Sequence, residues 1–138
     1  MVLTIERNKY IDDEFIAWLI DKIRYEICTT INENKLDIFN EYVKENNLFQ
    51  PVNNNSKFDI KQAIILSLNT LTYRKTNNVY IIEVGKNKLF PGYKVNLETV
   101  CKILDSGNTE IKGYPIFSKL FNNIKSNIVE YYEQYLDE

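Results

Sequence analysis

The fold class of this chain is decided by residues 71–84, which read LTYRKTNNVYIIEV. The residues before the polar turn Thr76–Asn78 follow a period of two, and the run that starts at Val79 is rich in β-branched and aromatic residues. This stretch therefore predicts an antiparallel β-hairpin. A short extended piece at residues 93–95 could add a third strand, which gives a hairpin or a three-stranded sheet around residues 70–95.

The segments on either side of the hairpin predict helices, because their apolar residues recur at spacings of three and four. The expected helices cover residues 13–31, 35–46, 60–71, 97–105 and 115–135. Asp12, Asp59 and Asn96 stand at N-cap positions. Gly107 stands where a left-handed residue ends a helix, and Pro115 is expected in the first turn of the last helix.

Two of these segments leave an alternative open. Asn32 or Asn34 either separates the first two segments into two helices or only bends one long helix. Ile64, Leu66 and Leu68 stand at alternate positions, so the third segment would also suit a strand.

Length and composition fit one folded domain. The chain has 138 residues, of which 44% are hydrophobic and 26% are charged. These fractions are close to the averages of about 45–50% and about 25% for globular domains. A single core commonly spans roughly 100 to 150 residues. We therefore expect one helix-rich α+β domain over residues 1–138.

The charge balance disfavours nucleic acid as a partner. The chain has 17 Lys and Arg against 19 Asp and Glu, a formal net charge of -2, and its lysines are scattered. It therefore has no broad positive field to attract phosphates. Apolar runs such as Ala63–Leu66 are far shorter than the roughly 20 residues that span a bilayer, and the first residues lack an apolar signal segment. We expect no membrane partner and a cytoplasmic protein.

The residues on which most enzymes rely are missing or out of order. The chain has no histidine, which is the commonest general base and metal ligand. Asp12, Asp13 and Glu14 lie at an expected helix start, where capping and the helix dipole explain them. The glycines form neither a dinucleotide motif nor a phosphate loop. We therefore expect no enzyme activity, no catalytic residue, no metal, no cofactor and no small-molecule substrate.

Cys28 and Cys101 each lie within an apolar periodic segment. Neither cysteine has a neighbouring thiol in a CxxC pattern or a histidine that could complete a metal site. Buried free thiols are the favoured interpretation, and a disulfide between the two is the alternative.

Aromatic residues exceed what single helix faces can bury. The tyrosines at positions 131, 132 and 135 cannot share one side of a helix that turns 100° per residue. The first helix likewise has apolar residues on more than one face around Trp18. Because tyrosine is enriched at protein contacts, we expect a partner interface. Its predicted members are Trp18, Phe117, Tyr131, Tyr132 and Tyr135. Trp18, Ile23 and Phe121 are also expected to lie largely buried, since each belongs to an apolar stripe.

A further pattern lies in residues 92–117, which read GYKVNLETVCKILDSGNTEIKGYPIF, with Gly107-Asn108-x-x-Ile111-Lys112-Gly113 as its core. From residue 79 to about residue 128, the chain resembles a stretch of small virion-associated proteins of tailed bacteriophages. The resemblance implies a structural subunit of the neck, connector or tail. Its partners would be other virion proteins or copies of itself, and its location the virion, assembled in the host cytoplasm.

Two other features agree with the phage resemblance. Asn, Ile, Lys and Tyr, which have AT-rich codons, are abundant, and this suggests an AT-rich genome such as that of a phage. The alternating residues Val2–Ile5 could add as a strand to the sheet of a neighbouring subunit. The alternative function is that of a phage- or plasmid-encoded binding protein that inhibits a host factor.

Overall fold

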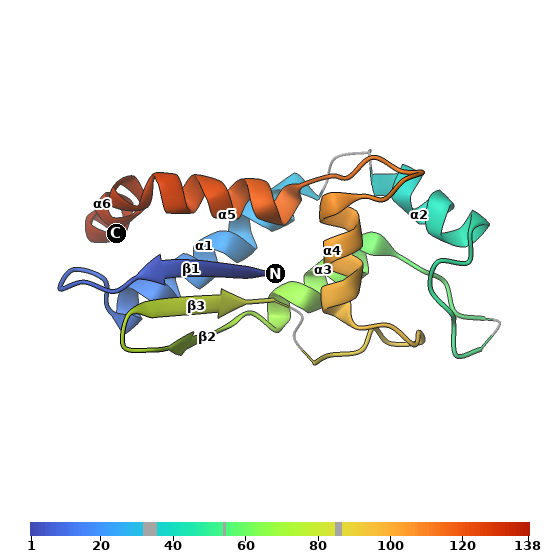
Figure 1. Cartoon of the computed structure of the whole chain (residues 1–138), viewed down its shortest axis with the longest axis horizontal. Helices are drawn as coiled ribbons and strands as arrows, with labels where there is room; N and C mark the ends of the chain where they lie inside the picture. Colours follow the sequence, from blue (N-terminus) through green and yellow to red (C-terminus); the bar gives the residue numbers. More distant parts are fainter. Residues whose placement is uncertain (32–35, 54, 85–86) are drawn as a thin grey trace.

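The computed structural model describes residues 1–31, 36–53, 55–84 and 87–138, and these form helices around a small sheet (Figure 1). The order is β1 (Val2–Glu6), α1 (Asp13–Thr30), α2 (Leu36–Glu45), α3 (Ile60–Asn69), β2 (Thr72–Lys75), β3 (Val79–Glu83), α4 (Leu97–Ser106), α5 (Ile116–Ser126) and α6 (Ile128–Asp137). Buried apolar side chains from both the sheet and the helices join one core cluster. The predicted helix-rich α+β fold class is confirmed.

β3 is the central strand of the sheet, whose strand order is β1-β3-β2 with antiparallel neighbours. β2 and β3 form the predicted hairpin, in which Lys75 pairs with Tyr80. β1 pairs with the other side of β3, where Leu3 stands opposite Ile82. The stretch that decided the fold class therefore forms two of the three strands.

The third strand is not the predicted one. The prediction placed it at residues 93–95, but this part of the chain makes only isolated bridges, such as the one between Pro51 and Tyr93. The N–H of Phe90 donates to the carbonyl of Val95 at 2.8 Å, so the chain folds back on itself before a strand can extend.

The third strand of the sheet is β1. The prediction that Val2–Ile5 adds to the sheet of a neighbouring subunit is therefore wrong. These residues pair with β3 of their own chain. Leu3 and Ile5 are 2% and 5% exposed, so the alternation that identified the strand serves the chain's own core.

The helices lie behind the sheet, along one of its edges and beyond one end of its strands. In Figure 1, α1 passes behind the sheet, α5 runs beside β1, and α3 and α4 lie beyond the strands on the right. α3 packs against α4, and α1 contacts both α5 and α6. No helix in the described parts of the chain has the length and apolar character needed to cross a membrane.

Local signals place the starts of α1 and α3 as predicted. The Oδ1 of Asp12 accepts a hydrogen bond from the N–H of Phe15 at 2.9 Å. Asp59 caps α3 in a similar way, with the N–H of Lys61 at 3.0 Å from its Oδ1. Residues 60–69 are helical, so the strand alternative for this segment is wrong.

α1 ends at a cap formed by Ile31, whose N–H donates to the carbonyl of Ile27. α2 begins at Leu36 and contacts α3. The question of whether Asn32 or Asn34 interrupts the first helix falls on residues outside the described ones.

Both cysteines are free, as favoured, but only one is buried. Cys101 lies on α4 in the contact with α3, where its Sγ donates to the Oγ of Ser67 at 3.2 Å. Burial raises the pKa of Cys101 to about 11. Cys28 is exposed, so its predicted burial is wrong. The neighbouring Ile27 is 1% exposed and occupies the inward face of α1 instead.

The predicted last helix is two helices, α5 and α6, which meet at Asn127. Asn127 has φ -124° and ψ 34°, and its side-chain amide donates to the carbonyl of Asn123 at 3.0 Å. Such bonds to the backbone are why asparagine suits helix ends better than helix interiors. α6 leaves the line of α5 at this point (Figure 1). Pro115 is the N-cap of α5, one residue before its expected place.

The pattern that prompted the phage resemblance forms a tight connection between α4 and α5. Gly107 follows α4 with a positive φ of 69°, but its ψ of -166° lies outside the left-handed helical region that was predicted. The Oδ1 of Asn108 accepts hydrogen bonds from the N–H groups of Glu110 and Ile111, at 3.0 and 2.9 Å. Gly107 and Asn108 therefore each have a local structural role in this loop.

Candidate partner interface

The residues predicted to form a partner interface fall into two groups. Phe117 is fully buried and Tyr131 is 6% exposed. Both belong to the core of this chain, which corrects their assignment to a surface. Each lies on an apolar helix face, and in both cases the chain's own elements cover that face. Trp18, Tyr132 and Tyr135 are half-buried and lie together.

A fully buried ring, Phe15, holds this second group together. Its centroid lies 5.9 Å from Trp18, 5.4 Å from Tyr132 and 5.5 Å from Tyr135. Trp18 and Tyr135 are 5.8 Å apart. These separations match the range of about 4.5–7 Å in which aromatic pairs attract one another. α1 and α6 each supply two rings at a spacing of three, so the cluster joins the two helices.

Further apolar side chains extend this cluster into solvent. Tyr10 is 57% exposed, and its ring lies 6.4 Å from that of Tyr132. Val129 and Leu136 are 66% and 61% exposed. They stand three residues before and four residues after Tyr132, which places them on neighbouring positions of α6. The α1–α6 surface is defined here as Tyr10, Trp18, Val129, Tyr132, Tyr135 and Leu136.

Trp18 is less buried than predicted. Ile23 and Phe121 are buried as expected, whereas Trp18 is only half-buried. Its indole Nε1 donates a hydrogen bond to Glu138, whose side chain is exposed. A ring with a buried body and a polar edge at the surface is typical of protein contacts.

Carboxylates border the α1–α6 surface. The hydroxyl of Tyr135 donates to the Oε2 of Glu14 at 3.5 Å. Partial burial raises the pKa of Tyr135, and the negative charges of Asp12 and Glu14 raise it further. The segment 128–138 has no Lys or Arg, and its acidic residues are Glu130, Glu133, Asp137 and Glu138. This part of the surface is therefore negatively charged.

The interface residues predicted from the sequence did not include Tyr10, Val129 and Leu136. Val129 and Leu136 could have been found, because they stand at helical spacing from Tyr132 once a helix starts after Asn127. Tyr10 precedes the first helix, and no sequence pattern links it to a ring near the other end of the chain.

A polar cluster elsewhere ties the hairpin to α1. The hydroxyl of Tyr80 donates to the Oδ1 of Asp13 at 2.6 Å, and the Nζ of Lys75 lies 3.4 Å from the same oxygen. The bond to Asp13, with burial, raises the pKa of Tyr80 to about 12, and the bond from Tyr80 lowers the pKa of Asp13. This cluster has a structural explanation, because it fixes the sheet on the start of α1.

Two hollows in the surface are lined by several elements. One of about 690 Å³ lies between α1 and α5, with polar side chains such as Glu26 and Asn123 in its lining. Another of about 480 Å³ lies at the loop before α3.

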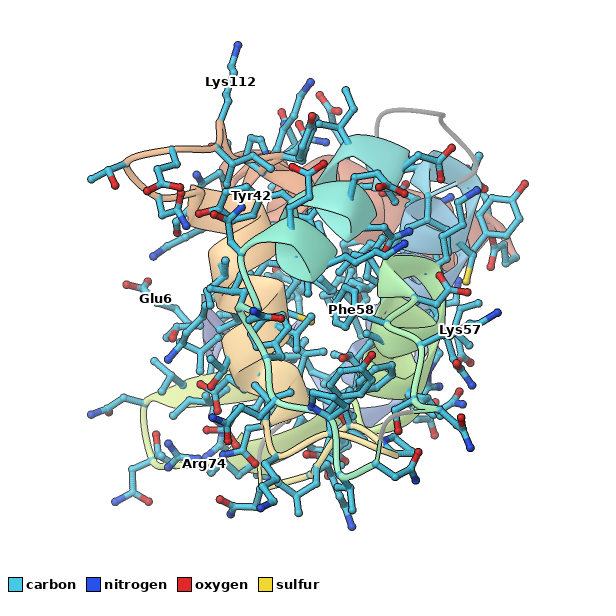
Figure 2. The ribbon with its side chains drawn as sticks, turned by 90° about the vertical axis from the view of Figure 1, so that its right-hand side faces the viewer. Glu6, Tyr42, Lys57, Phe58, Arg74 and Lys112 are labelled. Carbon is cyan, nitrogen blue, oxygen red and sulfur yellow. The ribbon has the colours of Figure 1, made fainter. Side chains whose placement is uncertain are left out.

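In Figure 2, Phe58 of this loop lies toward the middle of the molecule and Lys57 at its outer side. The ring of Phe58 packs against four other aromatic rings, which lie 5.3 to 6.2 Å away. These contacts anchor the loop.

In the described parts of the chain, no three His, Cys, Asp or Glu side chains gather into a group that could hold a metal ion. Comparisons with protein-family models, with curated proteins and with solved structures found no match. The α1–α6 surface combines exposed rings, exposed aliphatic side chains and, along α6, negative charge. That combination is the chemistry of a protein contact.

Proposed function

We propose that this chain is a non-enzymatic subunit that binds other protein chains through the α1–α6 surface. The observation that carries this proposal is the exposure of Tyr10, Val129 and Leu136 beside the half-buried rings of Trp18 and Tyr132. Single exposed apolar residues are ordinary, whereas a contiguous group with a polar rim marks contact sites. Tyrosine and tryptophan also contribute large contact area at a low cost in conformational entropy.

We place this subunit in a tailed-phage particle, at the neck, connector or tail. The support for this location is the resemblance of residues 79–128 to small virion-associated proteins. The close connection between α4 and α5 is compatible with the role, since a subunit of a closed ring must hold one shape to repeat the same contact. The same surface would also serve a protein that inhibits a host factor.

Recovery of the native assembly from its source tests the location. A virion subunit should copurify with particles at a fixed stoichiometry and appear in their mass spectrum. A chain that is absent from particles, sediments as a monomer and captures one host protein would overturn the virion role and favour the inhibitor.

Substitutions in the exposed part of the surface test the interface itself. Leu136→Ser should weaken partner binding by about tenfold or more, because burial of a leucine side chain contributes roughly 1.5–3 kcal/mol. It should change the free energy of unfolding by less than about 0.5 kcal/mol, as is usual for exposed sites. Ile38→Ser is the matched control, because Ile38 is 59% exposed on α2. Partner binding that resists Leu136→Ser and fails with Ile38→Ser would place the interface elsewhere.

A further inference from the structure

We infer that the partner segment that docks on the α1–α6 surface carries arginine or lysine side chains among apolar residues. This inference rests on the proposed function and specifies the chemistry of the partner.

The acidic residues at the end of α6 are not explained by the stability of that helix. Asp137 is the last residue of α6, Glu138 follows it, and the last turn has no basic residue. The C-terminal end of a helix carries partial negative charge, so cations stabilise it and carboxylates oppose it. The acidic residues at the start of α1 differ, because Asp12 caps that helix and the dipole favours them there. Glu138 accepts a hydrogen bond from Trp18, but a neutral acceptor would serve that bond, so a role outside the fold would account for the charges of Asp137 and Glu138.

These carboxylates have no cationic partner in the parts of the chain that the structure describes. Among the residues that the structure describes, no Lys or Arg side chain forms an ion pair with Glu14, Asp137 or Glu138. Glu14 and Glu138 instead accept hydrogen bonds from the polar edges of Tyr135 and Trp18. A carboxylate can accept several hydrogen bonds, so each retains capacity for a cation from outside.

The rings beside these carboxylates add a second attraction for a cation. Arg and Lys side chains are attracted to the faces of Trp and Tyr rings within about 6 Å, and guanidinium also stacks on them. One ring of the surface already has such a contact, since the Nζ of Lys9 lies 5.0 Å from the centre of the Tyr10 ring. A guanidinium placed on Trp18 or Tyr135 would have Glu138 or Glu14 beside it.

The same negative charges disfavour a second copy of this chain, nucleic acid or anionic lipid as the partner on the α1–α6 surface. In a two-fold contact, two copies of this surface would bring two α6 segments together, and neither segment has a Lys or Arg to neutralise the acidic residues of the other. An excess of like charge in an interface costs affinity. Phosphates of nucleic acid and anionic lipid would be repelled for the same reason. Val129 and Leu136 are exposed, so a partner segment that covers them would need apolar residues beside its cationic ones. A basic and partly apolar protein segment meets both requirements.

Trp18 offers a direct test, because it is the single tryptophan of the chain and lies in the surface. The full chain is titrated with an acetylated and amidated pentapeptide of alternating leucine and arginine, while tryptophan fluorescence is recorded. A saturable change that weakens in 0.5 M NaCl is expected. The matched peptide with glutamate in place of arginine should give no change. Equal responses to both peptides, or none to the arginine peptide at millimolar concentration, would overturn the inference.

A charge-neutral double variant then identifies the groups involved. Asp137→Asn with Glu138→Gln keeps an oxygen that can accept from Trp18 and removes both charges. The Kd of the arginine peptide should rise by about 3- to 10-fold, since exposed ion pairs are individually weak. Glu45→Gln is the matched control, because Glu45 is an exposed acidic residue at the end of α2. An unchanged Kd in the double variant contradicts the assignment.

Binding of the native partner to these variants distinguishes a failure of this inference from a failure of the proposed function. If Leu136→Ser releases the partner while the double variant and 0.5 M NaCl leave it bound, the surface is an interface without a cationic partner segment. The inference is then overturned and the proposed function stands. If no variant of the surface affects any partner, both are overturned.

Discussion

Gly107 and Gly113 lie so close together that a Cβ atom on Gly107 would stand 2.4 Å from the backbone nitrogen of Gly113. A Cβ on Gly113 would meet the carbonyl oxygen of Asp105 at 2.6 Å. Backbone atoms would have to move to admit either methyl group. The two glycines of this pattern therefore let the chain leave α4 and return to its end within one short loop.

Two glycine substitutions at positive φ compare this tight loop with a more open one. Gly107 and Gly92 both have a positive φ, 69° and 83°. Among the described residues, a Cβ on Gly92 would meet only the side chain of Ser56, at 3.0 Å. Gly92→Ala should thus cost roughly 1–2 kcal/mol of unfolding free energy, the usual cost of a left-handed alanine. Gly107→Ala should cost at least about 1 kcal/mol more, because its Cβ would meet backbone atoms and its φ of 69° with ψ of -166° is a conformation that essentially only glycine adopts. Urea unfolding measures both, and equal costs would mean that the loop opens easily.

Asp105 provides the cap that Pro115 cannot offer to α5. Its Oδ1 accepts hydrogen bonds from the N–H groups of Phe117 and Ser118, each at 3.0 Å. Asp105→Ala should lower the free energy of unfolding by about 1–2 kcal/mol, as for the loss of other helix caps. Asn96→Ala is the control, because Asn96 is the N-cap of α4 but makes no side-chain cap bond. It should cost less than about 0.5 kcal/mol. A larger effect at Asn96 than at Asp105 would reverse this assignment.

The hydroxyl of Tyr80 should lose its proton late in an alkaline titration. Its bond to Asp13 and its burial raise the pKa from 10.0 to about 12. Because the folded pKa lies above the unfolded one, the stabilisation is complete below pH 10 and is lost as pH rises through about 12. Tyr80→Phe should remove the step near pH 12 from the ultraviolet titration. Tyr25→Phe, at a site that is 68% exposed, should leave that step in place.

The two thiols should differ in reactivity. Cys28 is exposed, whereas Cys101 is buried with its pKa raised to about 11. Since the thiolate is the reacting form, a disulfide reagent such as dithionitrobenzoate should modify Cys28 in the folded protein and Cys101 only after unfolding. Cys28→Ser should therefore abolish the rapid reaction. Rapid modification of both thiols in the native protein would mean that the contact between α3 and α4 opens readily.

Short-range chemistry made several elements predictable. The turn at Thr76–Asn78 lies between two strands that follow each other directly, so their pairing needs no distant partner. Asp12 and Asp59 act on N–H groups within three residues of themselves. The break at Asn127 is also local, but apolar residues keep their helical spacing across it and hide it from a periodicity argument.

Contacts between distant segments could not be predicted in this way. The third strand required a choice between β1 and residues 93–95, and spacing along the chain does not show which segment reaches β3. An apolar helix face, such as that of Phe117, must be covered, but periodicity does not say by what. Packing of the chain's own elements covers Phe117 and Tyr131 and leaves Leu136 in solvent.

The hairpin at residues 71–84 and the capped helices were determined by the sequence, because turns, caps and apolar periodicity depend on residues only a few positions apart. The sequence also supplied the rings and carboxylates near both ends of the chain. Only the tertiary structure decided that they share one surface. The turn of the chain at Asn127 brings α6 against α1, and there Phe15 packs between Trp18 and Tyr132. Burial of a helix face depends on which distant elements meet, and that is settled by the packing of the whole chain.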